Sequence, residues 1–194
     1  MCAVANAHGA TEADVFLGAR ASEREIKRLS EAGILRGYRV LHFATHGALA
    51  GEVSGSAEPG LLLTPPGEGT QADDGYLSAS EIAGLKLDAD WVILSACNTA
   101  AGGSDKAETL SGLARAFFYA GARALLVSHW YVDSNATVAL IKATFAQLQT
   151  SPKLGRAEAL RRGILALINN GIEAQAHPSA WAPFVVVGEG GAGR

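Results

Sequence analysis

The stretch Trp91-Val-Ile-Leu-Ser-Ala-Cys-Asn-Thr99 decides the fold. Its first four residues form a continuous apolar run, which is typical of a strand buried on both faces of a parallel sheet. The run stops at Ser95, so Cys97 stands where the strand gives way to a loop. In open α/β sheets, ligands bind at the carboxyl ends of the strands. The stretch therefore predicts that Cys97 lies at a functional edge of the sheet.

A second stretch has the same layout. Tyr38-Arg-Val-Leu-His-Phe-Ala-Thr-His-Gly47 is a predicted strand that ends in His46 and Gly47, and His46 precedes Cys97 by 51 residues (97 − 46). If the two strands are parallel neighbours, their carboxyl ends meet at one edge of the sheet. We therefore expect the imidazole of His46 and the thiol of Cys97 to emerge side by side.

The rest of the chain completes an α/β pattern. Three apolar strands near 38–45, 91–95 and 124–128 alternate with helical patterns, which predicts a three-layer α/β/α sandwich with a mostly parallel central sheet. Helices are expected near 22–33, 78–85, 110–121, 135–148 and 157–169, strands near 15–18 and 181–188, and a small hairpin of 61–64 with 75–77. Since no repeat and no long linker divides the sequence, we expect one domain over 1–194 with loose ends at about 1–12 and 188–194.

Composition narrows the function classes. The chain has 194 residues, 48% of them hydrophobic, and a formal net charge of −3, which gives no electrostatic reason to bind nucleic acid or an anionic membrane directly. No apolar run reaches the length of a membrane span, and the N-terminus is a poor signal peptide. The two cysteines, Cys2 and Cys97, form no disulfide framework. A cytoplasmic protein is the simplest expectation.

A thiol and an imidazole at one edge allow acyl transfer. The thiolate of Cys97 is the nucleophile, and His46 can take the thiol proton and later protonate a leaving amine. The backbone N–H groups of Gly47 and Cys97 are candidates for an oxyanion hole, because glycine lets a substrate carbonyl approach closely. Metal-ligand spacing and phosphate-loop motifs are absent, so we expect no metal and no cofactor.

The two strand ends resemble those of the CHAT domain, a caspase-like group in the caspase/separase/gingipain clan of cysteine peptidases. The resemblance rests first on Leu41-His-Phe-Ala-Thr-His-Gly47 and Val92-Ile-Leu-Ser-Ala-Cys-Asn-Thr99. It extends in order over about 12–188 through further motifs: Gly60-Leu-Leu-Leu63, Gly75-Tyr-Leu-Ser-Ala-Ser-Glu-Ile82, Leu113-Ala-Arg-Ala-Phe117, Ala120-Gly-Ala-Arg123, Trp130 with Asp133, and His177-Pro-Ser-Ala-Trp-Ala-Pro-Phe184.

The resemblance implies a cysteine endopeptidase that cuts peptide or protein substrates through a thioester intermediate. It places the dyad on His46 and Cys97, and their separation is close to the roughly 50 residues found in caspases. Asn98 and Thr99 replace the Arg-Gly of the caspase pentapeptide, so strict specificity for aspartate is not implied. Such domains often follow helical repeats, which implies regulation by a partner or by a repeat domain. A non-catalytic interaction module and another Cys–His amidase stay open as alternatives.

Several neighbours of the dyad have two interpretations each. Trp130 and Asp133 follow the strand at 124–128 and could bind a basic side chain of the substrate, but Asp133 could equally cap the next helix. Glu108 could select a cation or only favour a helix N-terminus. His42 shares the face of His46 by strand alternation and could assist it, although a hydrogen-bonded core histidine is the simpler interpretation.

Overall fold

The central sheet has four strands. The structure, a computed structural model, describes residues 4–5, 9–53, 56–70, 72–95, 107–130 and 133–192, with the side chains of 107–111 left undescribed. In this part of the chain the strands are ordered β1 (Val40–Phe43), β5 (Trp91–Leu94), β6 (Ala124–Ser128) and β7 (Phe184–Gly188). β1, β5 and β6 are parallel, and β7 is antiparallel to β6. The predicted mostly parallel sheet is confirmed.

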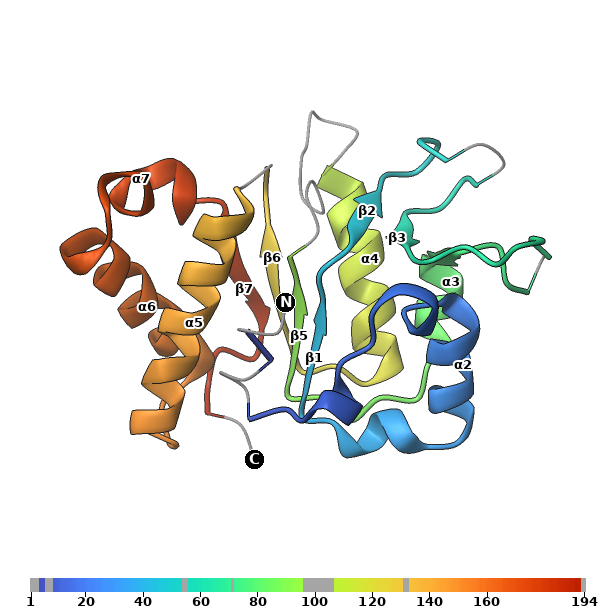
Figure 1. Ribbon diagram of the computed structural model, residues 1–194, viewed down its shortest axis with the longest axis horizontal. Helices are drawn as coiled ribbons and strands as arrows, with labels where there is room; N and C mark the ends of the chain where they lie inside the picture. The colour runs from blue at the N-terminus through green and yellow to red at the C-terminus, as the bar shows by residue number, and fades with distance from the viewer. Residues whose placement is uncertain are drawn as a thin grey trace.

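Helices cover both faces of this sheet (Figure 1). On one face lie α2 (Glu23–Glu31), α3 (Ala79–Ala83) and α4 (Ala107–Ala120), and on the other lie α5 (Ser134–Thr150) and α6 (Arg156–Asn170). A short α7 (Glu173–Ala176) follows α6. Short 3-10 turns complete the described elements: η1 (Glu12–Asp14), η2 (Gly18–Arg20), η3 (Ile34–Gly37) and η4 (Pro178–Ala180). The fold is the expected caspase-like α/β/α sandwich.

The alternation of side chains along each strand divides the interior into two cores. Val92 and Leu94 of β5 pack in one cluster with Phe117 of α4, whereas Trp91 and Ile93 pack in a second cluster with helix α5. All four β5 side chains are at most 1% exposed. A strand buried on both faces requires the continuous apolar run from which the fold was predicted.

A second, three-stranded sheet extends from the end of β1. Its antiparallel strands are ordered β2 (His46–Ala48), β3 (Gly60–Leu62) and β4 (Tyr76–Ser78), so the predicted hairpin is confirmed. The predicted strand at 38–45 is shorter than expected, because the chain leaves the central sheet after Phe43 and joins β3 instead. Gly60 allows this close packing, since a Cβ there would lie 2.6 Å from the Leu77 carbonyl oxygen.

Two other strand predictions need correction. Val15 to Leu17 form no strand, and η2 begins at Gly18; the first strand of the described chain is therefore β1. Phe16 packs on the larger core and carries the Arg20 guanidinium over its ring, 4.7 Å from the ring centre. The last strand begins at Phe184 rather than at 181, because Pro183 has no N–H to donate to a ladder. The predicted cap at Ser22 is confirmed: its side chain accepts a hydrogen bond from the Glu25 amide.

An ion cluster marks the edge at which the parallel strands begin. Asp90 stands one residue before β5 and is 6% exposed. Its carboxylate pairs with Arg39, which precedes β1, at 3.1 Å, and with Arg123, which precedes β6, at 3.6 Å. Arg156 of α6 approaches it to 3.6 Å and donates to the carbonyl oxygens of Glu189 and Gly191. The cluster joins three strand starts to the end of β7.

No helix in the described ranges has the length and apolar character that a membrane crossing requires.

Candidate active site

The register of β1 and β5 brings the two predicted strand ends together. Phe43 pairs with Leu94, and the ladder continues through the Ser95 amide, which donates to the Phe43 carbonyl oxygen at 3.1 Å. His46 and Cys97 each stand three positions beyond this last pair (46 − 43 and 97 − 94). Cys97 itself lies outside the described residues. The parallel, neighbouring strands on which the His–Cys prediction depends are present.

His46 is the first residue of β2 and is exposed to solvent. It lies opposite Leu62 of β3, whose side chain is 38% exposed. Because residues directly opposite in an antiparallel pair project on the same side, Leu62 is an apolar neighbour of the imidazole. The Thr45 hydroxyl donates to the Leu62 carbonyl oxygen and fixes the turn between the sheets. Leu62 was not among the predicted site residues, because only the strand pairing shows it beside His46.

Gly47 of β2 is the predicted oxyanion-hole residue of the His-Gly pair. It lies opposite Leu61 of β3. Gly47 is half-buried, whereas Leu61 is fully buried in the larger core. The packing of Leu61 therefore holds the backbone of β3, and with it the strand that carries His46 and Gly47.

A buried ionic brace holds the second sheet against α2. The Glu23 carboxylate, 1% exposed, accepts hydrogen bonds from the amides of Asp74 and Gly75 at 2.9 and 3.0 Å. Lys27 pairs with Glu23 and, at 2.7 Å, with Glu81 of α3. Burial raises the pKa of Glu81, but hydrogen bonds from Lys27 and Ser78 outweigh it, and the pKa lies below the usual value. The brace thus fixes the loop that leads into β4.

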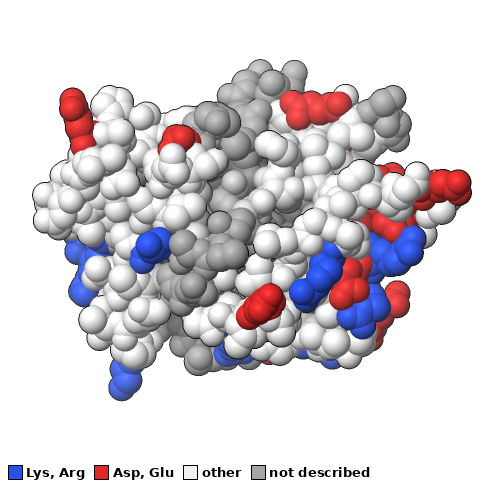
Figure 2. Space-filling model, viewed as in Figure 1, with Lys and Arg blue, Asp and Glu red and all other residues white. Residues whose placement is uncertain are grey.

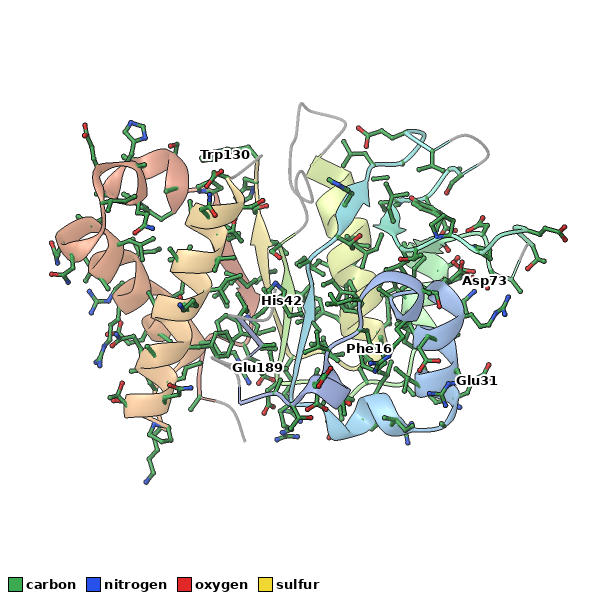
Figure 3. The ribbon with its side chains drawn as sticks, in the orientation of Figure 1. Phe16, Glu31, His42, Asp73, Trp130 and Glu189 are labelled. Carbon is green, nitrogen blue, oxygen red and sulfur yellow. The ribbon has the colours of Figure 1, made fainter. Side chains whose placement is uncertain are left out.

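His42 is half-buried and bonded to the end of β5. Its Nε2 lies 2.7 Å from the hydroxyl oxygen of Ser95, which confirms the interpretation of a hydrogen-bonded histidine. The expectation that His42 shares a face with His46 rested on one continuous strand. That argument fails, because β1 ends at Phe43 and His46 belongs to the second sheet. Figure 3 shows His42 at the centre of the molecule, beside β1.

The predicted substrate-binding residues lie beyond β6 and at α4. Trp130 is 45% exposed at the upper border of the molecule (Figure 3). Asp133 is exposed and caps α5: one carboxylate oxygen accepts the amides of Asn135 and Ala136 at 2.9 and 3.1 Å. The helix-capping interpretation of Asp133 is therefore what its contacts support. Glu108 lies in α4, with its side chain outside the described part of the structure.

Three segments at the edge where the parallel strands end carry acidic and no basic side chains, whereas the segment after β5 contains both Asp105 and Lys106. The segments 44–59, 129–137 and 171–183 contain the carboxylates of Glu52, Glu58, Asp133 and Glu173 and no Lys or Arg. Figure 2 shows the same distribution on one face, where the upper border carries acidic side chains and the basic ones lie lower. In the part of the chain that the structure describes, no three His, Cys, Asp or Glu residues are placed to hold a metal ion.

The chain belongs to the CHAT domain family, whose model matches residues 1–189. Membership agrees with the caspase-like sandwich described above. The chain is also similar to mouse (Mus musculus) "Tetratricopeptide repeat protein 28", with 33% identity over 116 residues. That match covers 58% of this chain but 4% of the mouse protein, so the chain spans a small part of its relative's length.

Proposed function

We propose that this chain is a cysteine endopeptidase that hydrolyses peptide bonds through a dyad of Cys97 and His46. The observation that carries the proposal is the parallel pairing of β1 with β5. It starts the two functional segments from neighbouring strand ends, with His46 and Cys97 equally far beyond the last register pair. Two side chains that follow adjacent strand ends can act on one carbonyl group.

The reaction follows from the ordinary chemistry of the two groups. His46 takes the proton of the Cys97 thiol, and the thiolate attacks the carbonyl carbon of the scissile peptide bond. The amides of Gly47 and Cys97 stabilise the oxyanion of the tetrahedral intermediate. The imidazolium then protonates the leaving amine, and a thioester remains on Cys97. Water activated by His46 hydrolyses the thioester and regenerates the thiol.

The acidic edge supports a substrate with a basic residue near the scissile bond. Trp130 would stack on a cationic side chain, and Asp133 and Glu108 would provide negative charge. A cleavage profile from a peptide library tests this preference. Preferred cleavage after aspartate would contradict the proposed preference for a basic residue.

Control by a repeat-containing partner or domain is the regulation we propose, supported by the similarity to a tetratricopeptide repeat protein. Activity should then rise when such a partner is added. The compartment that fits this scheme is the cytoplasm, where the thiol stays reduced.

A peptide-based acylating probe tests the proposed function. Mass spectrometry should find the probe on Cys97, and Cys97→Ala should abolish labelling and turnover while leaving the melting temperature unchanged. Cys2→Ser is the matched control, because it removes the other cysteine and should retain full activity. If Cys97 stays unlabelled with every candidate activator, the chain is a non-catalytic interaction module. Labelling by small amides but not by peptides would instead favour an amidase.

A further inference from the structure

We propose that the hydrogen bond between His42 and Ser95 is a positioning device that sets the distance between the imidazole of His46 and the thiol of Cys97. This inference rests on the proposed cysteine peptidase function. It adds two residues that do not touch the substrate but act through the dyad.

The bond joins two strands at the points where they lead into the dyad. His42 Nε2 lies 2.7 Å from Ser95 Oγ, and both residues are half-buried. Along the chain, His42 stands four residues before His46, and Ser95 two residues before Cys97. This side-chain hydrogen bond ties β1 directly to the end of β5.

The position of β1 in the sheet explains why its end needs such a bond. β1 is an edge strand of the central sheet, so β5 is its one neighbour there among the described strands. After Phe43 the chain leaves this sheet for β2, and the last backbone bond between the strand ends in the described residues runs from the Ser95 amide to the Phe43 carbonyl. The His42–Ser95 bond adds a side-chain link from Ser95 to the residue before Phe43 and resists separation of the two ends.

Small movements at this place have large consequences for catalysis. A displacement of about 1 Å of a catalytic group can cost about 100-fold in rate, because nucleophile and base must lie within hydrogen-bond reach. The link lies two residues before Cys97 in the sequence, so it restrains the strand end from which the proposed nucleophile follows. Its loss should therefore lower kcat and leave KM unchanged.

Variants can separate this role from ordinary stabilisation. Ser95→Ala and His42→Asn remove the bond, since the amide of asparagine does not reach the position of Nε2. Ser95→Thr keeps a hydroxyl, and His42→Gln places an amide nitrogen near the position of Nε2. Ser30→Ala is the matched control: Ser30 is 4% exposed, and its hydroxyl accepts the Lys86 amide at 2.9 Å, away from the dyad.

In peptide hydrolysis, Ser95→Ala and His42→Asn should each lower kcat by roughly 10- to 100-fold, with KM within about twofold. The double variant should lose less than the product of the two single losses, because the bond between the two residues is already absent in either single variant. Ser95→Thr and His42→Gln should restore most of the rate. Ser30→Ala should lower the melting temperature about as much as Ser95→Ala does. The kcat of Ser30→Ala should equal that of the wild type.

Alkylation of Cys97 gives a second readout that does not require turnover. In a Cys2→Ser background, the pH midpoint of iodoacetamide alkylation reports how strongly His46 favours the thiolate. Ser95→Ala should move this midpoint toward the value of about 8.5 for a free thiol, and Ser30→Ala should not.

The outcomes distinguish this inference from the proposed function. Wild-type kcat and midpoint in Ser95→Ala, with Cys97→Ala inactive, would refute the positioning role alone. The positioning role would also be refuted if the two losses in ln kcat simply added in the double variant, or if Ser30→Ala lost as much kcat as Ser95→Ala. Labelling of Ser95 by a fluorophosphonate would show Ser95 to be a nucleophile rather than a positioning residue. A wild-type midpoint near that of a free thiol would overturn the dyad itself.

Discussion

The two edges of the central sheet are built from different residues. At the edge where the parallel strands begin, the charged residues are paired: Asp90 is buried among Arg39, Arg123 and Arg156. Burial lowers the pKa of Arg156, and the charge of Asp90 opposes this effect. At the other edge His46 and Trp130 are exposed, and the carboxylates have no Lys or Arg in the same segments.

The difference between the two edges suggests that one contributes mainly to stability and the other to the proposed reaction. Opposite charges that satisfy one another hold elements together but cannot bind a substrate. The exposed side chains of His46 and Trp130 are accessible to a ligand, and carboxylates such as Asp133 accept backbone amides but have no cationic side chain in the same segments. Substitutions at the two edges should therefore affect different measurements.

The largest expected effect is on activity. His46→Asn removes the proposed general base, and kcat/KM for a peptide substrate should fall by about 10²- to 10⁴-fold. Since the side chain is exposed, the melting temperature should stay within a degree or two of wild type. If the melting temperature fell together with the activity, His46 would have a role in stability rather than in catalysis alone.

The opposite edge should give the opposite result. Asp90→Asn leaves three guanidinium groups without their shared carboxylate and should lower the free energy of unfolding by about 3 kcal/mol, measured by urea denaturation. The rate per folded molecule should not change. Asp88→Asn is the control, because the Asp88 side chain is 47% exposed and pairs with Arg39 at 3.6 Å. A similar loss of unfolding free energy in both variants would show that the burial of Asp90 does not determine its contribution to stability.

The brace under the second sheet lies between these extremes. Lys27→Met leaves the buried Glu23 without its cation and should cost about 2 kcal/mol, less than a fully buried pair because Lys27 is partly exposed. Hydrogen exchange should show the protection of β3 and β4 falling before that of β5. Uniform loss across the molecule would mean that the brace does not act locally.

The smallest effect concerns pH. The pKa of Glu81 is lowered in the folded state, so its contribution to stability is present above the unfolded value of about 4.5 and is lost as the pH falls through the folded value. The difference in melting temperature between wild type and Glu81→Gln should therefore shrink below about pH 4.5. Glutamine keeps one oxygen to accept the Ser78 amide at the start of α3 but loses the oxygen that accepts from Lys27, so the comparison measures the charge together with that hydrogen bond.

An exposed ion pair provides the control for this titration. Hydrogen bonds from Arg161 and Arg162 lower the pKa of Glu158 to about 2, but the side chains of these two arginines are 61% and 44% exposed, against 27% for Lys27 beside Glu81. Glu158→Gln should change the melting temperature little at any pH between 4 and 7. A change as large as that of Glu81→Gln would show that the greater exposure of the arginine partners does not weaken the ion pair.

Local patterns predicted much of this fold. The apolar run at 91–94 is typical of a doubly buried strand and was predicted as one, and the Ser22 cap and the hairpin are encoded by neighbouring residues. The strand predicted at 15–18 is wrong because Phe16 packs on the core from a loop. The break after Phe43 was also missed, because the chain there has the composition of a strand throughout and only β3 decides where it turns.

Short motifs and their spacing along the chain were enough to predict the family, most of the helices and strands, and the two residues proposed for the dyad. Tertiary structure alone decided that β1 pairs with β5 in this register, that Leu62 lies beside His46, and that His42 is bonded to Ser95. The physical reason is that pairing and packing depend on residues distant in sequence, and their energies are summed only when the chain is folded.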